Sequence, residues 1–186
     1  MKVNCPKISQ NCENQELLIV FCTFALVLFI LSFGGCAGMS GYSNKPLFPQ
    51  DISSVCLEMF DNQSFRRGVE YELSDALAKR IEADTPYKVI SSRDRADTVM
   101  SGQIVSIGES ALTIEREIGR ALEKEVQLTA VVSWKNLKTG ELLIDNQTVS
   151  AEATYSSYQM QGFSYASTLA ANNLAQKIVE LMETKW

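Results

Sequence analysis

Lys124-Glu-Val-Gln-Leu-Thr-Ala-Val-Val-Ser-Trp134 is the stretch that decides the fold. Apolar side chains occupy every second position in it, at Val126, Leu128, Ala130, Val132 and Trp134. Alternation of this kind is typical of a β-strand that buries one face, and the other face carries Gln127, Thr129 and Ser133, interrupted by Val131. Turn-forming residues follow at 136–140, and residues 141–155 return as the partner strand. The pattern predicts a β-hairpin.

An amphipathic helix is predicted on each side of this hairpin. In the first helix, apolar residues recur every four positions, at Phe65, Val69, Leu73, Leu77 and Ile81. Ser64 is the expected N-cap, and Pro86 ends the helix because proline restricts the residue before it and has no N–H to donate. In the second helix, the apolar positions are Phe163, Ala166, Leu169, Ala170, Leu174, Ile178, Leu181 and Met182. We expect each helix to bury one face.

Shorter extended segments complete the predicted fold. Residues 52–60 alternate as a strand, and residues 87–91 and 98–107 are extended on either side of a charged turn at 93–97. Residues 108–123 either extend the two flanking strands or form a mobile loop. We therefore expect an α+β fold with two helices packed on one face of a four-stranded, mostly antiparallel sheet, in the order β-α-β-β-β-α. The polar face of the hairpin is then open to solvent or to a partner.

The N-terminal part of the chain has the features of a leader. Residues 17–33 form an uncharged apolar run, and Gly34-Gly35-Cys36 follows at once. A short apolar run that ends in small residues is typical of a secretory signal. The ending also resembles a bacterial lipobox, where the peptidase cuts before a cysteine whose thiol is diacylated. The alternative is a single uncleaved anchor helix, because the run is at the lower limit for spanning a bilayer.

The lipobox divides the chain into three parts. We expect residues 1–35 to be a lipoprotein signal peptide, residues 36–50 a lipidated flexible tether that begins at Cys36, and residues 51–186 the folded domain. Ala37 follows the cysteine, whereas aspartate there is the usual inner-membrane retention signal, so we expect a lipid-anchored protein on the periplasmic side of the outer membrane.

Composition removes several classes of function. The chain has no histidine, which excludes Ser-His-Asp and Cys-His nucleophile activation and removes the commonest zinc ligand. Its net charge of -5 argues against a nucleic-acid partner. Of its five cysteines, only Cys56 belongs to the domain, where an apolar neighbourhood predicts a buried, inert thiol. Because no phosphate-loop, zinc-protease or serine-hydrolase motif occurs either, we expect a protein without enzymatic activity, metal or cofactor.

Two groups of side chains are candidate contacts for a partner or an anionic ligand. Arginine binds phosphate and carboxylate groups with two parallel hydrogen bonds, so the basic candidates are Arg66, Arg67, Arg93 and Arg95. The aromatic candidates are Tyr155 and Tyr158, in the polar stretch before the second helix. The alternatives are that the arginines only keep the surface soluble and that the aromatic stretch packs on the edge of the core.

The chain resembles the LPS-assembly lipoprotein (LptE) family. Residues 60–77 look like the end of that family's first strand and its helix, and residues 87–90 with 96–104 are similar to its second strand region. The resemblance implies an outer-membrane lipoprotein that sits as a plug in the LptD β-barrel and helps deliver lipopolysaccharide to the cell surface. It does not assign lipopolysaccharide contacts to particular residues, so the candidate arginines rest on their chemistry alone.

Two other functions remain open from the residues. One is a periplasmic lipoprotein scaffold for another envelope or secretion complex. The other is a carboxylate-dependent hydrolase, which needs two carboxylates that converge in a cleft.

Overall fold

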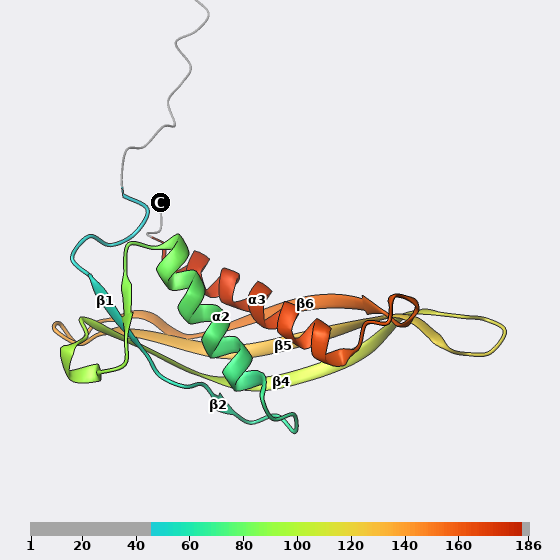
Figure 1. Cartoon of the computed structure of the whole chain (residues 1–186). Helices are drawn as coiled ribbons and strands as arrows, with labels where there is room; N and C mark the ends of the chain where they lie inside the picture. The colour runs from blue at the N-terminus through green and yellow to red at the C-terminus, as the bar shows by residue number, and fades with distance from the viewer. Residues whose placement is uncertain (1–45, 184–186) are drawn as a thin grey trace, which may run out of the picture. The chain divides into compact units, whose positions relative to one another are not determined.

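The computed structural model describes residues 46–183, in which two helices lie together on one side of a twisted sheet (Figure 1). The predicted signal peptide, Cys36 and most of the tether lie outside the described residues. The α+β fold class and the placement of both helices on one face are confirmed. The described part has six strands, so the expected four-stranded sheet and its order are wrong.

The predicted hairpin is present as β5 (Ala121–Asn136) and β6 (Leu142–Ser156), which pair antiparallel. Its alternating apolar residues all point into the core and are at most 2% exposed, namely Val126, Leu128, Ala130, Val132 and Trp134. In the turn, the Asn136 Oδ1 atom accepts hydrogen bonds from the backbone N–H groups of Lys138 (2.9 Å) and Thr139 (3.1 Å). Gly140 follows with a φ of 77°, a conformation that favours glycine.

β4 (Thr98–Ile114) pairs antiparallel with the other edge of β5 along its whole length. Residues 108–123 were expected either to extend the two flanking strands or to form a mobile loop. They extend both strands and turn at residues 115–120. The Glu115 backbone N–H donates to the Arg120 carbonyl oxygen at 2.8 Å and closes this turn. Figure 1 shows the resulting β4–β5 hairpin running well beyond the start of α3 (Phe163–Leu181).

The strand predicted over residues 52–60 is two strands. β1 (Ser54–Leu57) and β2 (Asp61–Asn62) pair separately with β4, both in parallel, and β3 (Lys88–Ile90) pairs in parallel with β1. The strand order is β3-β1-β4-β5-β6, with β2 beside β4, so the mostly antiparallel sheet is mixed.

The break between β1 and β2 places Phe60 in the core. Phe60 is 2% exposed, and its ring lies against Gly102 of β4, where an added Cβ atom would stand 2.5 Å from the ring. The alternation of apolar and polar residues over 52–60 predicts one continuous strand, so it does not reveal the break between β1 and β2.

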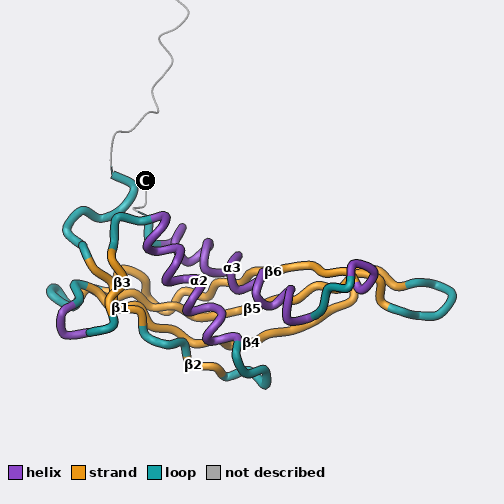
Figure 2. The backbone as a smooth tube through the Cα atoms, in the orientation of Figure 1, coloured by secondary structure: helices purple, strands orange, loops and turns teal. Residues whose placement is uncertain are grey.

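The helices are α2 (Val69–Asp84) and α3, drawn in purple in Figure 2. α2 buries Val69, Leu73, Ala76, Leu77 and Ile81. α3 presents small side chains to α2 and the sheet, which allows close packing, at Ala166, Ala170, Ala171 and Ala175. Thr85 and Pro86 end α2 as expected, and the Thr85 hydroxyl donates to the Ile81 carbonyl oxygen at 2.5 Å. No helix within residues 46–183 is long and apolar enough to span a membrane.

The start of α2 differs from the prediction. The helix begins at Val69 after Gly68, which has a φ of 100°, and Ser64 is not its cap. The Asn62 side chain instead accepts from the Ser64 backbone N–H (2.8 Å) and donates to the Arg66 carbonyl oxygen (2.7 Å). Such a side-chain turn competes with helix formation. Phe65, expected on the buried stripe, is consequently fully exposed at 107%.

Asp97 joins β1 to the start of β4. Its Oδ2 atom accepts hydrogen bonds from the backbone N–H groups of Ser53 (3.0 Å) and Ser54 (3.1 Å) and from the Ser54 hydroxyl (3.1 Å). The Lys138 ammonium contacts Oδ1 at 2.5 Å. The hydrogen bond from Lys138, and then those from Ser53 and Ser54, lower the pKa of Asp97 from 3.8 to about 2.

We expect this carboxylate to make folding stability depend on pH. The folded-state pKa lies below the unfolded value, so the stabilisation is complete above the unfolded pKa and is lost as the pH falls through the folded one. Asp97→Asn should lower the free energy of unfolding by about 2 kcal/mol near neutral pH. Urea unfolding at several pH values checks this. The difference in the free energy of unfolding between the unmodified protein and Asp97→Asn should become smaller as the pH falls from about 5 to about 2. A difference that stays constant would show that the charge of Asp97 is not stabilising.

Candidate functional site

The first turns of α2 and α3 border a cleft of about 490 Å³, which we call the arginine cleft. The residues that line it are Phe65, Arg66, Arg67, Val69, Glu72, Phe163, Ser164 and Ser167. The two helix starts are joined directly, since the buried Ser167 hydroxyl donates to Glu72 Oε2 at 3.0 Å. Both helices direct the positive ends of their dipoles to this region.

Arg66 bridges the loop before α2 to α3 and β4. Its guanidinium carbon lies 3.7 Å from the centre of the Phe163 ring, a cation–π geometry. Its Nη2 atom lies 3.7 Å from Glu109 Oε2. The Arg66 side chain is nevertheless half exposed, and it lines the cleft.

Glu109 is the centre of a small polar network. Its Oε1 atom accepts hydrogen bonds from the Lys124 ammonium and the Tyr155 hydroxyl, both at 2.7 Å. These two hydrogen bonds lower the pKa of Glu109, and the one from Lys124 has the larger effect. The pKa of Tyr155 is raised, first by burial of its hydroxyl and then by the hydrogen bond to Glu109. The hydrogen bond to Glu109 raises the pKa of Lys124. The network therefore keeps Glu109 ionised, and this charge holds Arg66 in place.

Glu70 fixes the loop that carries the arginines. Its Oε2 atom accepts from the Asn62 side chain at 2.6 Å and from the Gly68 backbone N–H at 3.0 Å. Hydrogen bonds from its own backbone N–H, from Asn62 and from Gly68 lower the pKa of Glu70. The carboxylates Glu70, Glu72 and Glu109 thus each accept a hydrogen bond that fixes their position.

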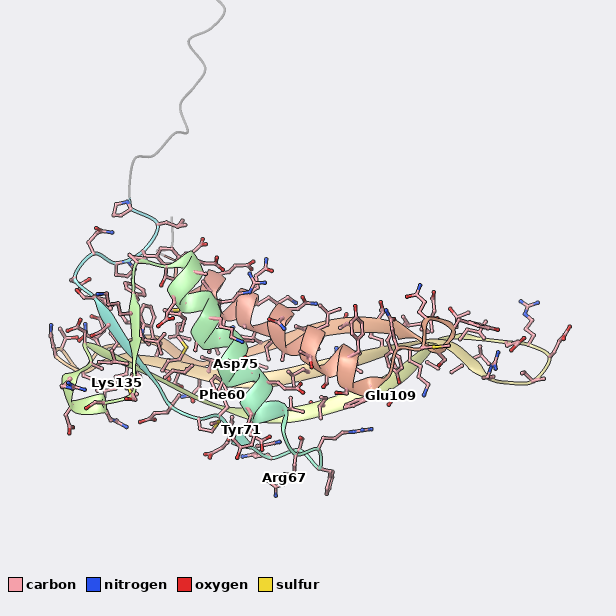
Figure 3. All side chains as sticks on the ribbon, viewed as in Figure 1. Phe60, Arg67, Tyr71, Asp75, Glu109 and Lys135 are labelled. Carbon is pink, nitrogen blue, oxygen red and sulfur yellow. The ribbon has the colours of Figure 1, made fainter. Side chains whose placement is uncertain are left out.

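Arg67 and Phe65 are the outward-facing groups of the same loop. Figure 3 shows Arg67 on the loop ahead of α2 and Glu109 near the start of α3. Within residues 46–183 Arg67 makes no ion pair, and Phe65 is fully exposed. The cleft therefore presents two cationic groups beside two phenyl rings, which suits a ligand with an anionic group and an apolar part.

The structure brings only some of the predicted candidates together. Arg66 and Arg67 line the cleft. Tyr155 is 7% exposed and belongs to the Glu109 network through its hydroxyl and through its ring, whose centre lies 5.9 Å from the Lys124 ammonium. Tyr158 lies beside the turn of the β4–β5 hairpin, where its hydroxyl accepts a hydrogen bond from Arg120 at 2.9 Å.

Arg93 and Arg95 lie in the 3-10 helix η2 (Arg93–Arg95), beside the start of β4 and apart from the cleft. Arg93 pairs with Glu58 at 2.5 Å, and Arg95 makes no ion pair in the described part of the chain. On this side of the sheet, Cys56 packs with Ala96 and Val99, which confirms the predicted burial of its thiol. Burial raises the pKa of Cys56.

Sequence reasoning missed Glu109, Lys124 and the role of Phe163. Glu109 and Lys124 come together only because β4 and β5 continue through the segment left open above, in the register that pairs Ala111 with Lys124. The sequence offered one indication of the position of Glu109. If the strand continues past Ile107, alternation places Glu109, two residues later, on the same face of the sheet as Ile107. Within residues 46–183, no three Asp, Glu or Cys side chains are grouped so that they could hold a metal ion.

Solved structures similar to this chain include bacterial proteins of low sequence identity. The hypothetical protein CT253 from Chlamydia trachomatis superposes with a TM-score of 0.51 and 10% identity, covering 69% of this chain and 94% of that one. Uncharacterized lipoprotein B from Nitrosomonas europaea gives 0.50 and 14%, covering 75% and 88%. Rare lipoprotein B from Shewanella oneidensis gives 0.46 and 16%, covering 70% and 93%. At these identities the first two likenesses show a shared fold alone.

No curated protein matches the chain closely enough to count as a relative. A family model does match, that of LptE, described as lipopolysaccharide-assembly, and it covers residues 52–186. The match extends over almost the entire body that contains the sheet, both helices and the arginine cleft. The chain therefore belongs to the LptE lipopolysaccharide-assembly family, as the resemblance in its sequence indicated.

Proposed function

We propose that this protein is an outer-membrane lipoprotein, anchored through Cys36, that plugs an LptD-type β-barrel and assists delivery of lipopolysaccharide to the cell surface. Membership of the LptE family supports the assembly role. The observation that supports a position inside a barrel is the character of the sheet face opposite the helices. This face is uncovered along the hairpin and polar, with exposed or half-exposed side chains at Gln127, Thr129, Ser133, Thr148, Ser150 and Glu152.

A polar sheet face fits the lumen of a large barrel, which is itself lined by polar side chains. The helices on the opposite face cover the apolar core, so the body presents hydrogen-bonding groups to its surroundings without exposing that core. This role needs rigidity and complementary contacts, and it needs no catalytic group.

The arginine cleft is the proposed lipopolysaccharide contact. Lipopolysaccharide carries phosphate groups next to acyl chains, and the cleft places Arg66 and Arg67 next to Phe65 and Phe163. Arginine binds phosphate with two parallel hydrogen bonds, and the phenyl rings offer apolar surface to the chains. Arg93, Arg95, Tyr155 and Tyr158 remain secondary candidates.

Depletion of the protein in its native cells tests the proposed function. We expect depletion to reduce surface lipopolysaccharide, measured by labelling of intact cells, and the full-length chain to restore it. Cys36→Ala should restore it poorly, because the body then lacks its membrane anchor, and mass spectrometry of the mature N-terminus reports the acylation directly. Surface lipopolysaccharide that is unchanged after depletion would contradict the proposal.

A further inference from the structure

One edge of the sheet is unpaired over a long distance. β1 covers the outer edge of β4 only at residues 98–100, and β2 covers it at Gln103 and Ile104. The last contact on this side is from the Gln63 backbone N–H to the Ile104 carbonyl oxygen, at 3.0 Å. Among the described residues, no hydrogen bond reaches the backbone of residues 105–114 from this side, although β5 pairs with the opposite side throughout. We call residues 105–114 the free β4 edge.

β6, the strand at the other edge of the sheet, is protected against further pairing. On β6, two carbonyl oxygens that face outward are capped by side chains of α3. Lys177 donates to the Ser150 oxygen at 2.7 Å, and Asn173 donates to the Glu152 oxygen at 2.9 Å. The strand is also kinked at Asn146, whose φ is 43°. Capping and kinking are ways in which proteins prevent edge strands from pairing with other chains. The free β4 edge has no side-chain caps among the described residues, although β4 shifts its register against β5 near Val105 and Leu112.

The composition of the free β4 edge permits a further strand. It contains no proline and no lysine, and its only charged residue is Glu109, whose carboxylate is turned to Lys124, Tyr155 and Arg66. Three of its apolar side chains remain exposed, Val105 at 42%, Leu112 at 51% and Ile114 at 56%. Backbone groups therefore stand ready for pairing, with apolar side chains on which an added strand can pack.

We propose that an extended segment of the partner polypeptide adds as a strand along the free β4 edge, in continuation of the line of β2. The segment is apolar and carries a carboxylate at the position that meets Arg66, whose Nη2 atom lies 3.7 Å from Glu109 Oε2 within the edge. Main-chain hydrogen bonds supply the affinity, and the ion pair with Arg66 fixes the register. The inference rests on the proposed function, because the partner is the polypeptide that the protein is proposed to assemble with.

Amide hydrogen exchange tests this pairing. The full-length chain is measured alone and in its complex with the barrel protein purified from the same cells. We expect alternate amides between residues 105 and 114, those that face away from β5, to exchange about ten-fold or more slowly in the complex. A complex that forms and leaves these amides as fast as in the free chain would overturn the inference and leave the proposed function standing.

Edge-blocking variants provide the second measurement. Val105→Lys and Leu112→Lys place a charge on the free β4 edge at exposed positions, and Leu142→Lys on β6, 50% exposed, is the matched control. We expect the first two to lower the barrel recovered with the chain several-fold and the control to leave it unchanged. Equal recovery for all three would overturn the inference. Protection of the edge in a dimer of this chain, without the barrel, would replace the proposed partner by a second copy.

Discussion

Gly102→Ala is expected to destabilise the protein by about 3 kcal/mol, a large effect for the addition of one methyl group. A Cβ atom at Gly102 would meet the Val131 backbone carbonyl oxygen on β5 and stand 2.5 Å from the Phe60 ring. Because the first obstacle is backbone, both clashes are relieved only if β4 moves away from β5 and the Phe60 ring also shifts. Urea unfolding measures the loss as a lower midpoint at an unchanged slope.

Gly108→Ala is the matched control in the same strand. An added Cβ at Gly108 meets nothing within 4 Å, and a strand interior favours alanine over glycine. We expect its midpoint to equal or slightly exceed that of the unmodified protein. Equal midpoints for the two variants would contradict the packing of Phe60 on Gly102, and with it the separation of β1 from β2.

Arg66→Ala combined with Arg67→Ala is expected to weaken lipopolysaccharide binding roughly ten- to a hundred-fold, because each guanidinium contributes charge-assisted hydrogen bonds to phosphate. The measurement is titration of the purified chain with fluorescent lipopolysaccharide in detergent, with thermal unfolding recorded to show that the fold is kept. Arg66 is the larger contributor, since Glu109 and Phe163 hold it in a fixed orientation.

Lys79→Ala combined with Arg80→Ala removes the same charge from the exposed side of α2 and is the control. These residues make surface ion pairs with Asp75 (2.6 Å) and Asp84 (3.4 Å), which contribute little to stability. The control should bind lipopolysaccharide like the unmodified protein. If Arg93→Ala with Arg95→Ala weakens binding instead, the ligand site lies beside η2 and the arginine cleft is not the contact.

The sequence predicts the regular parts of this fold well, for a physical reason. One face is buried over residues 126–134 of β5, 149–155 of β6 and 166–179 of α3, so the apolar period there appears directly in the residues. Leu169 and Leu181, expected on the buried face of α3, are exposed at 38% and 37%. The four-residue period of α2 likewise identifies its buried face from Val69 to Ile81. It does not locate the first turn, because an apolar residue at the right spacing, Phe65, belongs to a loop held by Asn62.

The parts that the sequence does not predict depend on contacts between distant segments. The short strands β1 and β2 form on β4 and β3 forms on β1, and their own residues do not specify the parallel pairing. The arginine cleft is a similar case. Arg66 and Arg67 are visible as candidates from their chemistry, whereas their grouping with Phe163 and Glu109 follows from the packing of α3 and the length of the β4–β5 hairpin.

We propose that this body is held inside an outer-membrane β-barrel. This is tested by purification of the full-length, affinity-tagged chain from detergent-solubilised native membranes, followed by mass measurement of the intact particle and identification of its components. We expect a complex of one lipoprotein with one LptD-type barrel that persists through size-exclusion chromatography. Recovery of the lipidated chain as a monomer with no barrel, from membranes that contain the barrel, would contradict the proposal.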